Sequence, residues 1–288
     1  MSPLALPSSL RDVVRQRRPM APWVATLAAT VADAQERWDL TIGAPFEPGG
    51  QTAWVAPART PAGTPVVLKV LWRHDESEHE ADALRAWDGN GAVRLLDDHS
   101  TADTTVMLLE RADPGTPLAT RPEPEQDLVL AGLLPRLWIE PGPDHPFRPL
   151  RAMCDRWAAS RERRIHRDED AGLVRDGIAL FRSLPRDAAH DVLLATDLHA
   201  HNALAATREP WLVIDPKPYV GDPTYDALQH LLNCPAQLRA DPEALIRRMA
   251  GLLDLDADRL RLWLFARCIV DTGWEPPWTD VARRLAPA

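Results

Sequence analysis

The sequence predicts an α+β protein with two lobes, a sheet-rich N-terminal lobe and a mostly helical C-terminal lobe. Up to about residue 112, short β-rich runs alternate with turn residues and enclose one inserted helix, and beyond it helical patterns dominate. The 288 residues, 45% of them hydrophobic and 26% charged, suit one large domain or two modest lobes. We place the lobes at residues 1–112 and 113–288, and a ligand cleft is expected where such lobes meet.

The N-terminal lobe is expected to begin with an amphipathic helix. Apolar residues recur at steps of three and four from Trp23 to Trp38, the spacing of a helix face docked on a core. An extended segment over residues 39–47 leads to the turn PGGQT at 48–52, and a strand follows over 53–58. A Gly-Gly turn between two short strands predicts a hairpin.

The following segments complete a sheet with one inserted helix. The run VVLKVLW at 66–72 is rich in β-branched residues and predicts a strand with one lysine among apolar neighbours. Residues 76–87 have helical periodicity, and GNG at 89–91 ends that helix. Further strands are expected around 93–96 and 105–110, and the turn DPGTP then marks the lobe boundary.

The C-terminal lobe is expected to be mostly helical. Helical segments are predicted over residues 127–138 and 151–164, with Pro-rich loops around the first. Short apolar runs at 192–195 and 211–214 predict two buried strands. Each run ends abruptly in polar residues, so we expect these strands to deliver polar side chains to one place.

Charge and cysteine usage exclude several classes of partner. A net charge of −9 opposes general affinity for nucleic acid or anionic lipid, which both require a basic surface, and weakly favours a cationic small molecule. Three widely separated cysteines without CxxC spacing indicate neither a disulfide framework nor a thiolate zinc site. No stretch approaches the roughly 20 apolar residues of a membrane span. We expect a cytoplasmic monomer that binds neither nucleic acid nor membrane.

The basic residues are strongly biased towards arginine. Of 33 basic residues, only Lys69 and Lys217 are lysine. Such a bias is typical of a GC-rich coding sequence, in which arginine replaces lysine wherever the chemistry tolerates it. A remaining lysine is then a candidate for a task that suits a compact ammonium, such as a place between phosphate oxygens.

The polar segment DLHAHN follows the first of the two buried runs, and Asp215 follows the second. On an extended chain Asp197, His199 and His201 would share one face and could bind zinc. Against zinc, no further ligand lies at a familiar spacing. The sequence also lacks the hydrolase motifs GxSxG and HExxH.

Phosphoryl transfer accounts for more of these residues. That reaction requires a carboxylate beside the attacking hydroxyl, a second carboxylate and an amide oxygen on Mg²⁺, and a cation on the nucleotide phosphates. The sequence offers Lys69, Asp197, Asn202 and Asp215 in this order, each on or just after a predicted strand. All four residues in this order are much less expected by chance than any one of them alone.

With these motifs in place, the sequence resembles the aminoglycoside and hydroxyurea phosphotransferase family, which includes streptomycin 6-kinases. The resemblance depends on WLVIDPKPYVGDPTYDALQHLLN, on DLHAHN ahead of it and on LKVLWRHDESEHEADALRAWDGNGAVRLL upstream, and it spans about residues 23–275. It implies a protein-kinase-like fold, ATP with Mg²⁺, and transfer of the γ-phosphoryl group to a small-molecule hydroxyl.

The resemblance also implies a role for each matching position. Asp197 would orient the acceptor hydroxyl and take its proton. Asn202 and Asp215 would bind the metal. The positions that would serve the nucleotide are Lys69 on the α and β phosphates, Glu80 orienting that lysine, Glu110 and Ala112 in the inter-lobe hinge, and Gly49 and Gly50 in the hairpin that covers the phosphates. Glu76 is the second choice for the glutamate that orients Lys69.

Two positions depart from the protein-kinase pattern. The residues before Asp197 are Ala195 and Thr196 where protein kinases have His-Arg, and the covering loop has two adjacent glycines instead of GxGxxG. Neither departure removes a phosphate, metal or hydroxyl partner, so activity is expected. Asp226 is expected to brace the catalytic loop, and Asp222 is equally open to a capping or a functional role.

The acceptor is expected to be an aminoglycoside such as streptomycin, held by carboxylates. Asp271 and Glu275 are the first candidates, and the RDED run at 167–170 is the second. The fold and phosphate machinery do not fix the acceptor, so a kinase of another small hydroxyl-bearing metabolite is the alternative within the enzyme class. Outside it, the alternative is a catalytically silent nucleotide-binding module.

Overall fold

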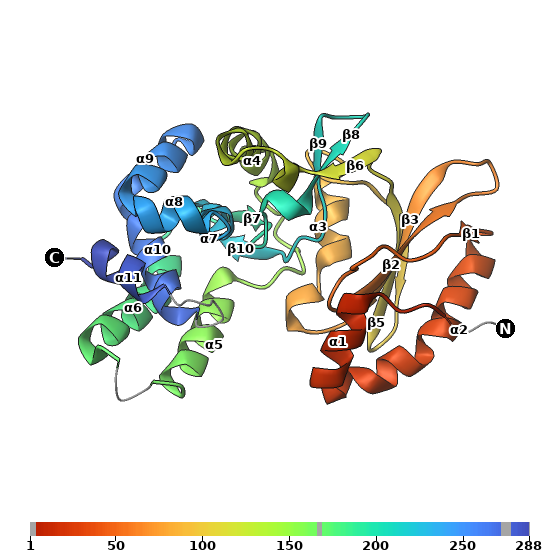
Figure 1. The fold of residues 1–288 in the computed structure, drawn as a ribbon, viewed down its shortest axis with the longest axis horizontal. Helices are drawn as coiled ribbons and strands as arrows, with labels where there is room; N and C mark the ends of the chain where they lie inside the picture. The colour runs from red at the N-terminus through yellow and green to blue at the C-terminus, as the bar shows by residue number, and fades with distance from the viewer. Residues whose placement is uncertain (1–3, 166–168, 272–277, 288) are drawn as a thin grey trace. The chain divides into compact units, whose positions relative to one another are not determined.

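The computed structural model describes residues 4–165, 169–271 and 278–287. The chain divides into two compact units, Met1–Gly115 with Ala206–Leu212, and Thr116–Ala205 with Val213–Ala288 (Figure 1). The division predicted from the sequence left residues 206–212 with the C-terminal lobe, whereas here this short segment packs with the first unit.

The first unit contains a five-stranded antiparallel sheet of order β1-β2-β3-β5-β4. Its strands are β1 (Thr41–Ile42), β2 (Ala53–Arg59), β3 (Pro65–Trp72), β4 (Leu95–Ser100) and β5 (Thr104–Glu110). Leu68 and Val70 of β3 join a core with α1 (Ser8–Gln16) and α2 (Ala21–Arg37). Because side chains alternate along a strand, Lys69 points to the other face, towards α3 (Glu80–Trp87).

The segment before β2 is less regular than the sequence predicts. Only Thr41–Ile42 forms a strand within the expected 39–47, because Pro45 and Pro48 have no N–H to donate to a ladder. One hydrogen bond from Gly43 N to Pro57 O (2.8 Å) and another from Phe46 N to Val55 O (2.9 Å) hold the segment beside β2. The glycines therefore lie in a longer loop and not in a tight hairpin.

Helical ends also differ from the predictions by a few residues. Asp75–Ser77 forms a separate 3₁₀ turn capped by His74, and α3 begins only at Glu80. Helix α1 was not predicted, because only Leu10 of its nine residues is buried.

The second unit is mostly helical, as predicted. Helix α10 (Ala257–Val270) packs against α6, α9 and α11, and it buries Trp263 and Phe265 completely. The Asp256 carboxylate caps its first turn by accepting from two backbone N–H groups. The other helices are α4 (Glu123–Leu137), α5 (Leu150–Glu162), α6 (Ala171–Ser183), α7 (Leu228–Leu232), α8 (Pro235–Ala240), α9 (Pro242–Leu253) and α11 (Thr279–Leu285).

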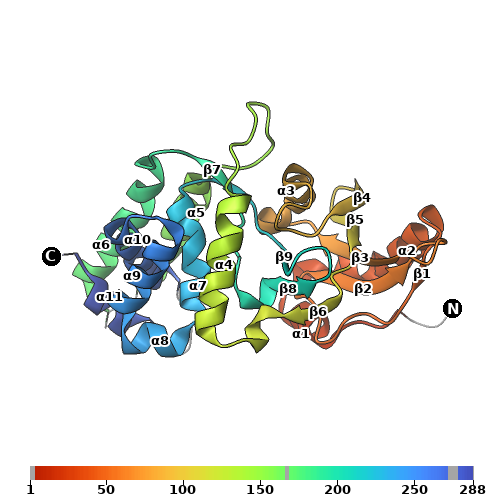
Figure 2. The same cartoon turned by 90° about the horizontal axis from the view of Figure 1, so that it is seen from above.

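Short strands carry the loops on which the site depends. Strands β7 (Val192–Leu194) and β10 (Tyr219–Gly221) pair antiparallel, with Leu194 opposite Tyr219. Strands β6 (Pro114–Pro117), β8 (Ala203–Ala206) and β9 (Trp211–Val213) form a second small sheet of order β6-β8-β9. Helix α4 packs against α9, as Figure 2 shows from above.

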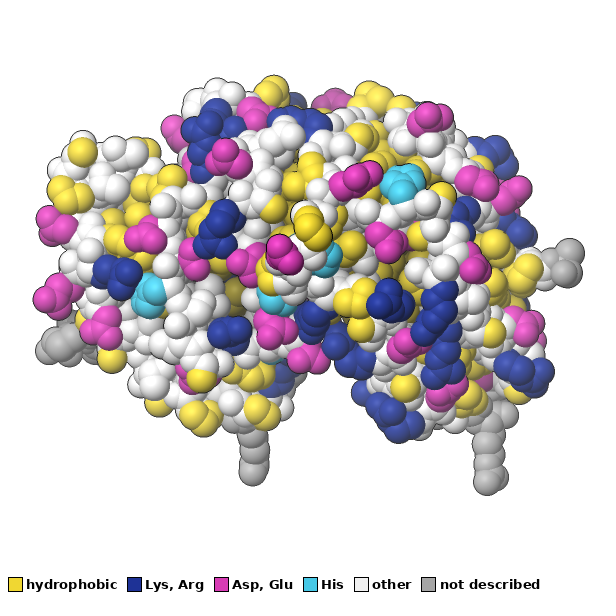
Figure 3. All heavy atoms as spheres, turned by 180° about the vertical axis from the view of Figure 1, so that it is seen from behind, with side chains coloured by type: hydrophobic (Ala, Val, Ile, Leu, Met, Phe, Trp, Pro, Cys, Tyr) yellow, Lys and Arg dark blue, Asp and Glu magenta, His cyan; other side chains and the backbone are white. Residues whose placement is uncertain are grey.

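None of the helices within the described residues is long and apolar enough to cross a membrane. On the face drawn in Figure 3, acidic and basic side chains are interspersed among hydrophobic ones. On this face the acidic side chains are scattered and do not gather at one place.

Candidate active site

In the first unit, Lys69 and Glu80 form a buried ion pair. Nζ of Lys69 in β3 lies 2.6 Å from Oε1 of Glu80, the first residue of α3, and the two side chains are only 6% and 1% exposed. Lys69 is flanked in the sheet by Val55 and Met107. Since removal of either partner would leave a charge in an apolar setting, the geometry of this pair is strongly fixed. Glu76 is not the partner in this pair.

Asp197 follows the end of β7 in a loop that Asp226 braces. The Asp226 carboxylate accepts hydrogen bonds from Ala195 N (3.0 Å), Thr196 N (2.6 Å) and Trp138 Nε1 (3.1 Å). Burial raises the pKa of Asp226 to about 6, and these hydrogen bonds oppose the rise. Thr196 has a left-handed backbone, φ 48°, which turns the chain at the residue before Asp197.

Asn202 lies against the backbone of Asp197. Its Nδ2 donates to Asp197 O at 2.9 Å, which identifies the other end of the amide as an oxygen acceptor. The carbonyl of Asn202 accepts from Ile214 N at 2.9 Å, so the residue before Asp215 is tied to Asn202. One short network therefore brings Asp197, Asn202 and the Asp215 turn together.

Asp215 also has a left-handed backbone, φ 53°, and its carboxylate faces Lys217. Oδ1 of Asp215 lies 3.0 Å from Lys217 Nζ, and the two side chains are 38% and 16% exposed respectively. Lys217 N donates to Ala195 O at 2.8 Å, and the Lys217 carbonyl accepts from the Thr196 hydroxyl. The donors on Asp215 and Asn202 are a carboxylate and an amide oxygen, which is the chemistry that Mg²⁺ prefers, and solvent reaches the carboxylate.

The histidines of DLHAHN take a local structural role. Nδ1 of His199 accepts from His201 N at 3.3 Å and so caps a 3₁₀ turn at Ala200–Asn202. Burial, with a smaller effect of His201, lowers the pKa of His199 to about 4, which makes the ring neutral at neutral pH. Among the described residues, Asp197, His199 and His201 do not form a group with metal-binding geometry.

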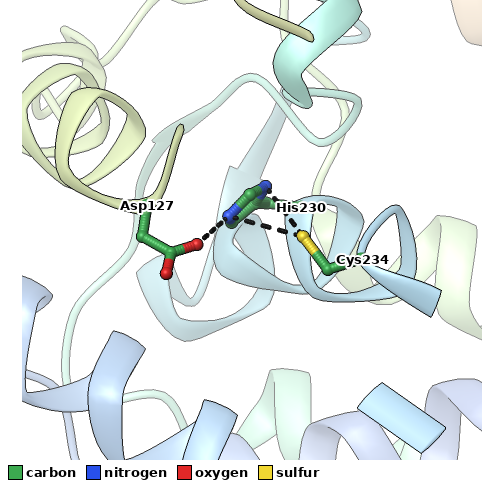
Figure 4. A group of neighbouring side chains, drawn as sticks. All are labelled: Asp127, His230 and Cys234. Carbon is green, nitrogen blue, oxygen red and sulfur yellow. Dashed lines mark hydrogen bonds and ion pairs between the residues drawn. The ribbon is translucent and has the colours of Figure 1, made fainter. Parts of the chain in front are cut away.

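A different buried cluster, which no sequence motif predicted, contains Asp127, His230 and Cys234 (Figure 4). Asp127 Oδ1 lies 2.7 Å from His230 Nε2, and Asp127 Oδ2 accepts from Arg248 Nε at 2.6 Å. The thiol is 3.8 Å from both ring nitrogens, and burial raises its pKa to about 12. Both carboxylate oxygens are thus already bonded, and the cluster joins α4, α7 and α9 as a structural brace.

Asp222 is also structural. Its carboxylate is buried and accepts from Thr224 N (2.9 Å), Arg259 Nε (2.7 Å) and Trp263 Nε1 (2.6 Å). Of the two roles left open for Asp222, the structure supports the capping role. The same carboxylate also anchors α10.

At the hinge position, the Glu110 side chain serves the fold of the first unit. Its carboxylate accepts from Arg208 Nε (2.8 Å) and Nη2 (2.9 Å), and Arg208 also donates to the carbonyls of Gly89 and Ala92. Glu110 N donates to Arg94 O, so among its backbone groups only the carbonyl remains a candidate for an adenine contact. No sequence motif predicted the Arg208 contact, because it joins residues that are 98 positions apart.

Gly49 packs closely against the N-terminal segment. It has φ +80°, and a Cβ there would lie 2.4 Å from Cβ of Pro7. Ser8 N and Oγ donate to Glu47 Oε2 at 3.0 and 2.9 Å, which fixes the start of α1 on the same loop. Gly50 requires no left-handed conformation. The structure therefore explains Gly49 by a fold contact, independently of any phosphate.

The predicted acceptor carboxylates are only partly described. Asp271 follows α10 and pairs with Arg267 at 3.3 Å, while Glu275 lies outside the described residues, as does Asp168 of the RDED run. In that run, Glu169 accepts from the buried Arg161 and Asp170 caps α6. Glu169 therefore pairs with a buried arginine and Asp170 serves as a helix cap.

Comparison with known proteins identifies the family of this chain. The model of the aminoglycoside/hydroxyurea antibiotic resistance kinase family matches residues 37–277. The chain is 38% identical to a hydroxyurea phosphotransferase of Kitasatospora aureofaciens over 90% of this chain and 76% of that protein. It is 35% identical to a streptomycin 6-kinase of Streptomyces griseus over 88% of this chain and 84% of that one.

Solved structures show the same fold at low sequence identity. A macrolide 2'-phosphotransferase from Brachybacterium faecium superposes with a TM-score of 0.57 at 17% identity, over 90% of this chain and 98% of that one. An amicoumacin kinase superposes with a TM-score of 0.56 at 13% identity, over 90% of this chain and 91% of that one. The predicted two-lobed kinase-like class is confirmed, and the chain belongs to the aminoglycoside/hydroxyurea antibiotic resistance kinase family.

Proposed function

We propose that this phosphotransferase moves the γ-phosphoryl group of ATP to a hydroxyl of a small cationic molecule, with an aminoglycoside such as streptomycin as the first candidate. The observation that carries the proposal is the braced loop in which Asp197, Asn202 and the Asp215 turn are joined by hydrogen bonds to the backbone carbonyls of Asp197 and Asn202. The streptomycin 6-kinase relatives, both at 35% identity, support the choice of acceptor.

In the proposed reaction, Asp197 acts as the general base. The acceptor oxygen forms a bond to the γ-phosphorus while its proton passes to the Asp197 carboxylate. The bond from the γ-phosphorus to the β–γ bridging oxygen breaks, and its electron pair leaves with ADP. Asp226 supports this step from a distance because it holds the backbone of the two residues before Asp197.

Asp215 and Asn202 would hold Mg²⁺, since their oxygens match its preference and the Asp215 carboxylate is within reach of solvent. The ion supplies charge compensation on the phosphate oxygens. In the first unit, Lys69 would bind the α and β phosphates with Glu80 fixing its position. The Glu110 carbonyl and the Ala112 N–H would face the adenine edge, and the loop with Gly49 and Gly50 would cover the phosphates.

The acceptor would be held by acidic side chains, to which a net charge of −9 adds a general attraction for cations. Asp271 is bound to Arg267, so its use as a ligand requires that this pair separate. A kinase of another small hydroxyl compound is the second candidate, and the hydroxyurea phosphotransferase relative at 38% identity favours it.

An ADP-release screen with purified protein, ATP and Mg²⁺ tests the proposal, with streptomycin, other aminoglycosides and hydroxyurea as acceptors. We expect acceptor-dependent ADP release and a product heavier by one phosphoryl group in mass spectrometry. Asp197→Ala is the matched control and should release ADP only at the background rate. Thermal stabilisation by MgATP without turnover on any acceptor would instead support a silent nucleotide-binding module.

A further inference from the structure

Lys217 is the second of only two lysines among 33 basic residues, and both lysines pair with carboxylates at positions implied to serve phosphate chemistry. Lys69 pairs with the predicted phosphate-site Glu80, and Lys217 pairs with the predicted metal ligand Asp215. A chain that uses arginine almost everywhere thus keeps lysine at these two positions.

The backbone of Lys217 is fixed to the loop that carries Asp197. Its N–H donates to Ala195 O at 2.8 Å, and its carbonyl accepts from the Thr196 hydroxyl. Asp226 in turn holds Ala195 and Thr196 by their N–H groups. The Lys217 backbone is therefore anchored to Ala195 and Thr196, the two residues before Asp197. The part of Lys217 that can move is its four-carbon side chain with the ammonium.

Solvent reaches the Lys217–Asp215 pair from its carboxylate side. The Asp215 side chain is 38% exposed and that of Lys217 is 16% exposed, so this pair costs less to separate than a fully buried one. The same carboxylate is the proposed metal ligand, so the ammonium and a divalent ion compete for it. Once Asp215 ligates the ion, the displaced ammonium is close to the metal-bound phosphate oxygens and carries the charge that they attract.

We propose that Lys217 is a catalytic residue whose ammonium leaves Asp215 and binds an oxygen of the transferring phosphoryl group. This inference rests on the proposed function. The acceptor oxygen bonds to the γ-phosphorus, the acceptor proton goes to Asp197, and the electron pair of the broken bond leaves with ADP. Lys217 keeps all its protons and contributes only positive charge.

This exchange requires a lysine. A guanidinium presents two parallel N–H donors that match a carboxylate, so an arginine here would hold Asp215 more firmly and oppose metal binding. A compact ammonium makes a single-point contact and can change its partner.

The test compares Lys217→Met and Lys217→Arg with the wild type, and Arg283→Met as a control for loss of a positive charge at a 57% exposed side chain. Calorimetric titrations with AMP-PNP and with ADP, at saturating Mg²⁺, measure the preference for the triphosphate. We expect Lys217→Met to lose about tenfold in AMP-PNP affinity, with ADP affinity changed less than about twofold, and kcat to fall about 10²-fold. Arg283→Met should match the wild type in every measurement.

Lys217→Arg should require more Mg²⁺ for half-maximal AMP-PNP binding than the wild type. If Lys217→Met keeps the wild-type ratio of AMP-PNP to ADP affinity, or if its kcat stays within about twofold, the proposal is overturned. Should Lys217→Met fail to fold, an unchanged Mg²⁺ midpoint in Lys217→Arg overturns it. The binding ratio needs no acceptor, so it stays informative where the wild type phosphorylates nothing, a result that would instead contradict the proposed function.

Discussion

The two lysine–carboxylate pairs of this chain differ mainly in how far solvent reaches them. Lys69 and Glu80, 2.6 Å apart in the first unit, are 6% and 1% exposed, whereas Lys217 and Asp215, 3.0 Å apart in the second, are 16% and 38% exposed. A buried pair cannot separate without leaving a charge in a medium of low dielectric constant, so it is a fixed part of its unit. An exposed pair separates at little cost and can exchange partners.

The largest effect is expected from Asp197→Asn, which leaves both pairs intact and removes only the base. We expect kcat to fall by about 10²–10⁴-fold, the usual contribution of a positioned general base. Nucleotide affinity should stay at the wild-type value, because neither lysine pair is altered. ADP release and AMP-PNP titration measure the two quantities, and a variant with near-wild-type kcat would remove Asp197 from the chemistry.

The comparison of the pairs is tested directly by unfolding Lys69→Met and Lys217→Met in urea. Lys69→Met should lose about 3–5 kcal/mol of unfolding free energy, because the Glu80 charge stays buried. Lys217→Met should lose no more than about 1 kcal/mol. Equal losses of unfolding free energy in the two variants would show that the difference in burial does not make the two pairs differ in stability. Lys69→Met should also weaken the use of ATP.

The brace under the Asp197 loop predicts a pH dependence of stability. Burial raises the pKa of Asp226 to about 6 in the folded protein, against about 3.9 when unfolded, so the folded protein binds more protons between these values. This contribution is fully present below about pH 4 and is lost as the pH rises through 6. Relative to Asp226→Asn, the wild type should lose up to about 3 kcal/mol from pH 4 to 7. Parallel pH profiles of the urea unfolding free energy for the wild type and Asp226→Asn would contradict this prediction.

The smallest effect is expected where the first unit binds residues 206–212. Burial tends to raise the pKa of Glu110, but the hydrogen bonds from Arg208 and Arg94 outweigh it and leave the pKa lowered. Glu110→Gln should lower the free energy of unfolding by about 1 kcal/mol, since the Arg208–Glu110 pair is partly exposed. Hydrogen exchange of residues 206–212 should increase in the variant. Unchanged exchange would mean that the Arg208 pair does not hold this segment.

Local patterns were reliable where one segment carried its own signal. The alternation around Lys69, the helical spacing from Trp23 and the strand that ends before Asp197 each depend on neighbours in sequence, and each element is present. The Lys69–Glu80 pairing followed from the resemblance to a known family. The helix expected from residue 76 was wrong by one turn because His74 and Ser77 form a capping box of their own.

Local patterns failed where a polar group finds its partner across the fold. Asp222 looked open to a functional role, yet its carboxylate accepts from Trp263 Nε1, 41 residues away in sequence. No sequence pattern linked Asp127 with His230, because the two residues are 103 positions apart and meet only when the helices pack. Periodicity reports which face of an element is buried and says nothing about which distant side chain will meet it.

By itself, the sequence determined the order of chemical groups, with a lysine on a strand, DLHAHN after a second strand and Asp215 after a third. These are local facts, set by strand propensity and by turn residues at the strand ends. Only the tertiary structure decided what holds those groups and which of them can move. Asp226 reaches back 30 residues to fix Thr196. Lys69 and Glu80 are 6% and 1% exposed, whereas solvent reaches the Asp215 partner of Lys217, because solvent exposure depends on the packing of the whole unit.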